Sequence, residues 1–170
     1  NVAADAFVNS AITGVNGGLI VLAADDPSMH SSQNEQDSRF YGKFAMIPIL
    51  EPSSQQEAYD MMQYGFELSE QLHLPVLMCV GTRRAHSRAD GEVGGKAEQN
   101  SLKPDNERTH WVLLPGNARR QYSSLVEKQS ELLDRAEKSP YNKMQIEVEK
   151  AELGIVACGI AYNYVMENNL

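Results

Sequence analysis

The sequence predicts an α/β fold, a partial doubly wound and mainly parallel sheet, and three observations carry this prediction. Three short apolar runs, residues 18–24, 46–50 and 75–80, have the length and composition of strands. The segments between them space their apolar residues as amphipathic helices do. The joins between the elements are short, and such an alternation favours parallel pairing through right-handed crossovers.

The first part of the chain combines a helical pattern with a strand pattern. Residues 1–11 place apolar side chains mostly three or four positions apart, which favours a helix. Residues 18–24 are continuously apolar, which is typical of a buried parallel strand. We expect a helix over residues 36–45 and a second strand over 46–50. Pro48 has no backbone N–H to donate, so that strand should be short, irregular or at a sheet edge.

A capping box marks the start of the next helix. Ser54 and Glu57 have the spacing at which a Ser and a Glu side chain satisfy the first amides of a helix. The apolar stripe of that helix has a helical period and consists of Ala58, Met61, Met62, Gly65, Leu68 and Leu72. Residues 75–80 should then form a strand that is buried on both faces, because their apolarity is unbroken.

The composition changes after residue 88. Residues 89–108 contain few apolar side chains to offset the entropy of ordering them, which predicts a flexible linker. Residues 109–150 are predicted to be a helical connector. Its long helix, over 118–137, has an inner face made of Tyr122, Leu125, Val126, Leu132, Leu133 and Ala136. In residues 151–170 we expect the start of a second α/β domain, with a strand and a turn over 153–159 and a helix over 160–168.

The composition excludes several classes of protein. A net charge of -8 without a basic stripe argues against a nucleic-acid-binding protein. The apolar runs are far shorter than the roughly 20 residues of a membrane-spanning helix. Cys79 and Cys158 lie far apart and outside any CxxC spacing. We therefore expect a reducing, cytoplasmic location and no zinc or iron–sulfur site within this chain.

A dense polar run, residues 25–39, follows the first strand directly. Because open α/β sheets bind ligands at the C-terminal ends of their strands, we interpret this run as a candidate ligand site. The alternative is a solvated loop that caps the next helix. Asp25 and Asp26 resemble a pair of metal ligands, yet adjacent carboxylates before a proline also cap turns. Arg39 lies four positions after Glu35, so a helical ion pair is another interpretation of that arginine.

A second polar cluster follows the third strand and consists of Thr82, Arg83, His86 and Ser87. At the C-terminal end of a parallel strand these residues either contribute to a site or form an ordinary polar surface. His30 beside Ser31 also suggests a hydrolase, but the sequence has no Gly-x-Ser-x-Gly elbow to support that chemistry.

Three stretches carry a resemblance to a known family. They are residues 17–39 (GGLIVLAADDPSMHSSQNEQDSR), 49–58 (ILEPSSQQEA) and 74–77 (LPVL) with 82–87 (TRRAHS). They resemble the alpha subunit of indolepyruvate ferredoxin oxidoreductase, a thiamine diphosphate-dependent 2-oxoacid:ferredoxin oxidoreductase. The resemblance implies that residues 1–88 are the C-terminal half of its pyrimidine-binding domain. It also implies that residues 151–170 begin its transketolase-C-like domain.

This resemblance implies an enzyme that oxidatively decarboxylates arylpyruvates such as indolepyruvate to acyl-CoA, with ferredoxin as the electron acceptor. The implied cofactors are thiamine diphosphate, Mg²⁺, [4Fe–4S] clusters and coenzyme A, and the implied partners are a beta subunit and ferredoxin. The family's catalytic glutamate, Gly-Asp-Gly motif and cluster cysteines belong to segments outside residues 1–170. We therefore expect an internal fragment that is inactive alone and binds none of these cofactors, and we assign no catalytic residue.

The implied chemistry gives roles to the polar run. Thiamine diphosphate supplies a carbanion that attacks the 2-oxo carbon, while the protein positions and polarises the substrate. Arg39 is the candidate that pairs with the substrate carboxylate. The candidates that orient the substrate or donate to an oxyanion are His30, Ser31, Ser32, Gln33 and Asn34.

A second function class stays open beside the enzyme. The alternative is a non-catalytic α/β module of the same fold that binds a small ligand or another protein, because fold alone does not determine function. If strands of the complete sheet lie outside this chain, its exposed sheet edge invites self-association, so we expect oligomers.

Overall fold

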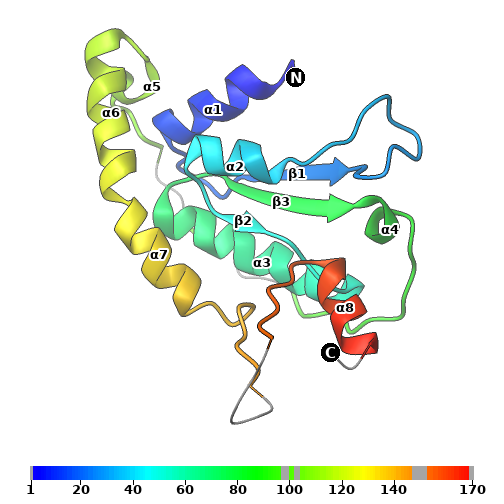
Figure 1. Ribbon diagram of the computed structural model, residues 1–170. Coiled ribbons are helices and arrows are strands. Elements are labelled where there is room, and N and C mark those ends of the chain that lie inside the picture. Colours follow the sequence, from blue (N-terminus) through cyan, green and yellow to red (C-terminus); the bar gives the residue numbers. More distant parts are fainter. Residues whose placement is uncertain (1, 97–99, 102–103, 147–152, 169–170) are drawn as a thin grey trace.

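A three-stranded parallel sheet lies at the centre of the computed structural model, which describes residues 2–96, 100–101, 104–146 and 153–168 (Figure 1). The strands are β1 (Ile20–Asp25), β2 (Ile49–Leu50) and β3 (Val76–Gly81), in the spatial order β1-β3-β2. Each strand coincides with one of the apolar runs. The predicted α/β fold with a mainly parallel sheet is therefore confirmed.

The register brings the ends of the two long strands together. Ile20 lies opposite Val76 and Asp25 opposite Gly81, so the residues that follow β1 and β3 leave the sheet at one edge. The short β2 pairs with β3 through Ile49 and Leu50 alone. This shortness agrees with the prediction from Pro48, which accepts a hydrogen bond from the Leu77 amide at 3.0 Å but has none to donate.

Helices cover both faces of the sheet. α1 (Ala4–Thr13) and α2 (Arg39–Ala45) lie on one side, and α3 (Gln55–Leu72) lies on the other (Figure 1). Two close approaches fix these helices to the sheet. A Cβ atom at Gly42 of α2 would lie 2.6 Å from the Ile49 side chain, and one at Gly65 of α3 would lie 3.0 Å from Ile20. Glycine is therefore what lets each helix approach the strands.

The capping box at α3 forms with one change. The Ser54 hydroxyl accepts a hydrogen bond from the Glu57 amide at 3.0 Å, as predicted. The Glu57 carboxylate reaches back to the amide of Ser53, one residue before the N-cap, rather than to Ser54 itself. The helix therefore starts where the sequence predicts.

The core is centred on β3. Val76, Leu77, Met78 and Cys79 are each at most 4% exposed, which confirms that this strand is buried on both faces. Strand β1 differs, because Leu22 is 59% exposed and β3 is its one neighbour in the described sheet. The prediction that residues 18–24 form a buried strand is therefore wrong for the described part of the chain, because every residue of β1 is at least partly exposed.

The long helix predicted over residues 118–137 is two helices, α6 (Pro115–Glu127) and α7 (Gln129–Glu137). At their junction the Lys128 ammonium donates to the Leu72 carbonyl at 2.6 Å. Of the predicted inner face, Leu125 is buried and Leu132 packs against the core. The remaining residues of that face are exposed, namely Tyr122, Val126, Leu133 and Ala136. Only part of the apolar face predicted for α6 and α7 therefore packs against the core.

The end of the described chain also departs from the prediction. Residues 153–158 form no strand, and Leu153 and Val156 are 71% and 96% exposed. The strand predicted there is wrong, because this apolar segment pairs with no strand among the described residues. The predicted helix does follow, as α8 (Ile160–Glu167).

Two short helices were not predicted, α4 (Thr82–Ala85) and α5 (Arg108–Trp111). Each is a single turn, too short to produce a periodic apolar pattern. Among the described residues, no helix combines the length and the apolarity that crossing a membrane requires.

Candidate functional site

The polar run and the start of α4 meet at the C-terminal edge of the sheet. In Figure 1 the loop after β1 and the helix α4 extend beyond the two arrowheads. The Thr82 hydroxyl donates to the Asp25 carbonyl at 3.0 Å and to the Asp26 carboxylate at 3.1 Å. The loop that follows β1 and the first residue of α4 thus meet at one hydrogen-bonded edge, which is where ligands bind in open α/β sheets.

The Asp26 carboxylate organises the loop that contains most of the candidate residues. One oxygen accepts hydrogen bonds from the amides of Ser31 at 2.8 Å and Ser32 at 3.1 Å, and the other accepts from the His30 amide at 3.1 Å. Asp26 is only 5% exposed. The hydrogen bond from the Ser31 amide is the main reason why the pKa of Asp26 lies well below its usual value. The loop turns through Met29, which adopts a left-handed φ of 53°.

The Asp25 carboxylate accepts hydrogen bonds in the same way from the residue that precedes α2. Its two oxygens accept hydrogen bonds from the Ser38 amide at 2.7 Å and the Ser38 hydroxyl at 2.6 Å. Both carboxylates are thus engaged by the loop, which agrees with the capping interpretation. The metal interpretation finds no support, since the described residues contain no group of three or more His, Cys, Asp and Glu side chains that could hold an ion.

Arg39, the first residue of α2, is held by two carboxylates. Its Nε and Nη2 atoms donate to the two oxygens of Asp37, both at 2.8 Å. Its Nη1 lies 3.6 Å from Oε2 of Glu51. The ion pair that the sequence suggested between Arg39 and Glu35 on one helix is wrong, because α2 begins at Arg39 and Glu35 lies outside the helix. The pairing lowers the pKa of Asp37 and raises that of Arg39.

Glu51 is the residue of this site that the sequence did not indicate. It directly follows β2, and its side chain is 28% exposed beside Arg39. Gly159, the residue before α8, lies against it, since a Cβ atom there would be 2.6 Å from Oε1 of Glu51. Burial raises the pKa of Glu51 above its usual value, and Arg39 opposes that shift. The signal that could have revealed it is an acid immediately after an apolar strand.

Known proteins match nearly the whole chain. The indolepyruvate oxidoreductase subunit IorA of Methanothermobacter thermautotrophicus is 46% identical over 170 residues, which is 98% of this chain. The IorA subunits of Thermococcus kodakarensis and Archaeoglobus fulgidus are 42% and 41% identical over the same share of the chain. The chain belongs to the IorA family. The resemblance carried by residues 17–39, 49–58, 74–77 and 82–87 is thereby confirmed.

The match covers only part of each IorA protein. The chain spans about a quarter of these relatives, 27% of the length of each of the three. No family model matches the chain. No solved structure matches it significantly.

The polar cluster after β3 is mainly engaged in contacts within the chain. Besides the bonds of Thr82, the Arg83 guanidinium lies 5.7 Å from the centre of the Tyr164 ring in α8. The Ser87 hydroxyl accepts from the Gln55 side chain at 2.6 Å. These contacts favour the interpretation of the cluster as structural surface, with Thr82 supporting the candidate loop.

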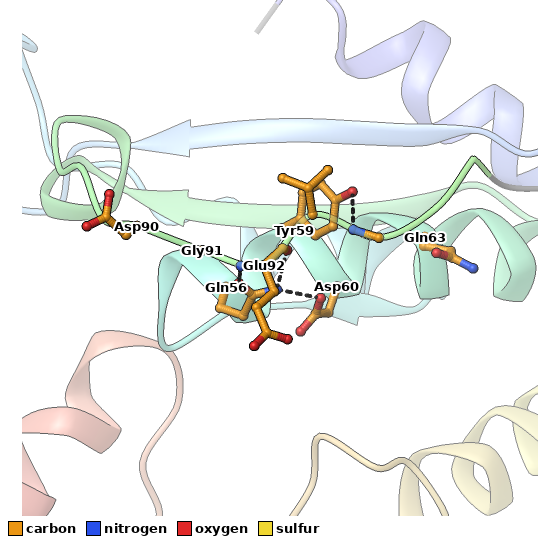
Figure 2. A pocket seen from close by; sticks show the side chains of 9 residues that line it. Gln56, Tyr59, Asp60, Gln63, Asp90, Gly91 and Glu92 are labelled. Carbon is orange, nitrogen blue, oxygen red and sulfur yellow. Dashed lines mark hydrogen bonds between the residues drawn. The ribbon is translucent and has the colours of Figure 1, made fainter.

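A groove lies elsewhere, between α3 and residues 90–94 (Figure 2). The Gln56 side chain accepts from the Glu92 amide at 2.8 Å and donates to the Glu92 carbonyl at 3.1 Å. The Tyr59 hydroxyl accepts from the Gly94 amide at 3.1 Å. None of its lining residues belongs to the polar run, so this groove is separate from the candidate site.

The predicted site residues thus fall into two groups. The side chains of His30, Ser31, Gln33 and Asn34 are exposed and that of Ser32 is partly so, while the amides of residues 30–32 are occupied by Asp26. Arg39 lies in the second group, with Asp37 and Glu51. Arg39 is held by the carboxylates of Asp37 and Glu51, while the His30 ring in the first group contacts the Asp26 carboxylate, with Nδ1 3.1 Å from Oδ1.

Proposed function

We propose that this chain is part of an oxidoreductase subunit that acts on indolepyruvate and related arylpyruvates. The proposed reaction is oxidative decarboxylation to acyl-CoA with ferredoxin as the electron acceptor. The observation that carries the proposal is the similarity of 98% of the chain to proteins named indolepyruvate oxidoreductase subunit IorA. The position of the polar run at the C-terminal edge of a parallel sheet supports it independently.

In this proposal Arg39 binds the carboxylate of the 2-oxoacid. A guanidinium has five N–H donors, and Asp37 takes one at Nε and one at Nη2. Of the three that remain, one on Nη1 and one on Nη2 face the Nη1–Nη2 edge, which can bind a second carboxylate in a bidentate manner. The Arg39 side chain is 52% exposed, so a substrate can reach that edge. The loop residues His30, Ser31, Ser32, Gln33 and Asn34 would then contact the substrate through their side chains.

The cofactors are proposed to bind outside the described residues. Thiamine diphosphate would supply the carbanion that attacks the 2-oxo carbon. The described residues hold no candidate cluster for its Mg²⁺ ion, so they do not fit the diphosphate end of the cofactor. We therefore assign thiamine diphosphate, Mg²⁺, the [4Fe–4S] clusters and coenzyme A to other parts of the subunit or its partners, and no reaction step to this chain alone.

The proposed assembly follows from the same assignment. Residues 1–88 would contribute half of a pyrimidine-binding domain, 89–108 and 109–150 a linker and a helical connector, and 151–170 the start of the next domain. The partners would be a beta subunit and ferredoxin in the cytoplasm. Strand β1 has one strand neighbour in the described sheet, and Leu22 on its face is 59% exposed. Both observations support association with further polypeptide, and we expect the isolated chain to be inactive and oligomeric.

The test uses the complete subunit with its partner subunit, thiamine diphosphate, Mg²⁺ and coenzyme A. We expect indolepyruvate to drive the reduction of ferredoxin. Arg39→Ala should raise the KM for indolepyruvate at least tenfold, because a charge-assisted bidentate pair contributes about 1.5–3 kcal/mol. Arg119→Ala, an exposed arginine on α6, is the matched control and should leave KM unchanged. Absence of ferredoxin reduction with every 2-oxoacid tried would contradict the proposal.

A further inference from the structure

Arg39 holds its two carboxylates in different ways. Asp37 accepts two side-chain hydrogen bonds at 2.8 Å and one from the Arg39 amide at 3.1 Å. Glu51 approaches a single nitrogen, Nη1, at 3.6 Å, which is beyond hydrogen-bonding distance. Asp37 is therefore a fixed partner that orients the guanidinium, whereas Glu51 is a loose counter-ion beside Nη1.

The surroundings of Glu51 do little to hold its negative charge. Asp25, at the end of β1, and Asp37, before α2, both repel it, and Arg39 is the cation that attracts it. Cys79 of β3 and Cys158, before α8, also interact electrostatically with this cluster. Burial and repulsion raise the pKa of Glu51 above its usual value.

The free edge of Arg39 is the same edge that the proposed substrate needs. Because Asp37 occupies Nε and Nη2, a second carboxylate can bind in a bidentate manner only across Nη1 and Nη2. Glu51 lies at Nη1. Two carboxylates at this one edge would repel each other as ions, so a bound substrate requires that Glu51 move away or take up a proton.

We propose that Glu51 is a resident competitor, which occupies the substrate end of Arg39 and is displaced by the carboxylate of the 2-oxoacid. This inference rests on the proposed function and deepens it. Glu51 would lower the affinity for substrate at neutral pH and keep Arg39 paired between turnovers. Protonation of Glu51 releases the Nη1 edge, so substrate affinity rises as the pH falls towards the pKa of Glu51.

The experiment compares Glu51→Gln with the wild type in the complete enzyme, using indolepyruvate as the probe. An amide cannot compete as an anion, so the KM should fall about threefold to fivefold at neutral pH, the range set by an exposed ion pair. The fall in KM should disappear at low pH, where Glu51 of the wild type is already neutral. Glu127→Gln, an exposed glutamate on α6, is the control.

Two further measurements separate competition from a structural role. The methyl ester of indolepyruvate carries no carboxylate, and its KM should be the same for Glu51→Gln and the wild type. Glu51→Ala should lower the KM for the acid as well, provided that thermal melting shows the variant to be folded; if it is not, Glu51→Gln alone decides. A KM for indolepyruvate that is unchanged or raised in Glu51→Gln would overturn the inference.

The failure of this inference can be distinguished from that of the proposed function. If the wild type reduces ferredoxin and Arg39→Ala raises KM, but Glu51→Gln does not lower it, the competitor role alone is wrong. If the wild type oxidises no 2-oxoacid, the proposed function is wrong and the competitor role falls with it.

Discussion

The hydroxyl of Thr82 lies 3.1 Å from the buried carboxylate of Asp26, although 56 positions separate the two residues. The same hydroxyl donates to the Asp25 carbonyl at 3.0 Å. One side chain at the start of α4 therefore holds the loop that follows β1. The candidate site depends on this contact, because Asp26 in turn binds the amides of His30, Ser31 and Ser32.

We predict that Thr82→Val loosens the loop while leaving the sheet intact. Valine preserves the shape of the side chain but removes the donor, and a lost hydrogen bond of this kind costs about 1 kcal/mol of stability. Hydrogen exchange of the amides of residues 30–32 should accelerate. Thr82→Ser should restore protection, and Thr109→Val, at an exposed position on α5, should have no effect on this loop. If the amides of residues 30–32 exchanged at the same rate in Thr82→Val as in the wild type, the hydrogen bonds of Thr82 would not be needed to hold the loop.

Asp26→Asn should destabilise the loop at neutral pH and alter the acid unfolding of the protein. The two oxygens of the Asp26 carboxylate accept hydrogen bonds from the backbone amides of His30 and Ser31. In asparagine one of these oxygens is replaced by an NH₂ group, which is a donor and cannot accept from an amide. Because the pKa of Asp26 is lowered in the folded state, the unfolded chain takes up a proton first as the pH falls. The stabilisation by Asp26 is thus present above its usual pKa and is lost in acid.

The measurement is urea unfolding as a function of pH. The gap in stability between the wild type and Asp26→Asn should be widest near neutral pH and should shrink below pH 3.8, the usual pKa of the group. Asp90→Asn, at an exposed position in the groove segment, is the control. A gap that does not change with pH would mean that the charge of Asp26 contributes nothing to the fold.

The order of helices and strands was predictable because the signals are local. The apolar runs and the stripe of α3 can be recognised without knowing what each packs against. The capping interpretation of Asp25 and Asp26 agrees with the structure, since both carboxylates accept hydrogen bonds from amides of the loop that follows them. By contrast, the strand predicted over residues 153–159 depended on a partner strand, which local sequence cannot supply.

The composition of the candidate site was only partly predictable for the same reason. Arg39 could be selected from its place in the polar run, but the carboxylates that hold it belong to Asp37 and Glu51 and not to Glu35. Glu51 matters because Arg39 and Gly159 approach it from distant parts of the chain. Neither contact has a sequence spacing that would reveal it.

Gly42→Ala should destabilise the protein by about 1–2 kcal/mol. A Cβ atom at this position would lie 2.6 Å and 2.7 Å from two carbons of Ile49 and 3.0 Å from Leu77. Overpacking of this kind costs about 1–3 kcal/mol, and the better helix propensity of alanine offsets part of it. Chemical denaturation gives the difference directly.

Two matched variants test this packing argument. Ile49→Val removes the terminal carbon next to Gly42, so Gly42→Ala should be less harmful in that background. Gly116→Ala on α6 meets nothing within 4 Å and should be neutral or slightly stabilising. Equal losses at both glycines would argue against close contact between α2 and the sheet.

The two cysteines should differ sharply in reactivity. Cys79 lies in the core at 4% exposure, and burial raises the pKa of its thiol to about 12. Cys158 is exposed. Because the thiolate is the reactive form, a thiol-specific disulfide reagent should modify one thiol in the native protein and both after denaturation. Cys158→Ser should abolish the native reaction and Cys79→Ser should not; rapid loss of two thiols without denaturant would contradict the burial of β3.

Glu51→Gln should increase stability at neutral pH, an effect that needs no substrate to be measured. The raised pKa of Glu51 means that the folded protein keeps a proton over a range in which the unfolded chain has already lost it. The free energy of unfolding of the wild type therefore falls as the pH rises from the usual value of 4.5 through the folded pKa. Glutamine cannot ionise, so the advantage of the variant should grow over that interval and then level off.

Thermal melting across this pH range measures the difference in stability between Glu51→Gln and the wild type, with Glu127→Gln as control. If Glu51→Gln instead melted lower than the wild type at neutral pH, the pair with Arg39 would outweigh the burial of the charge, and Glu51 would be a stabilising partner rather than a displaceable one.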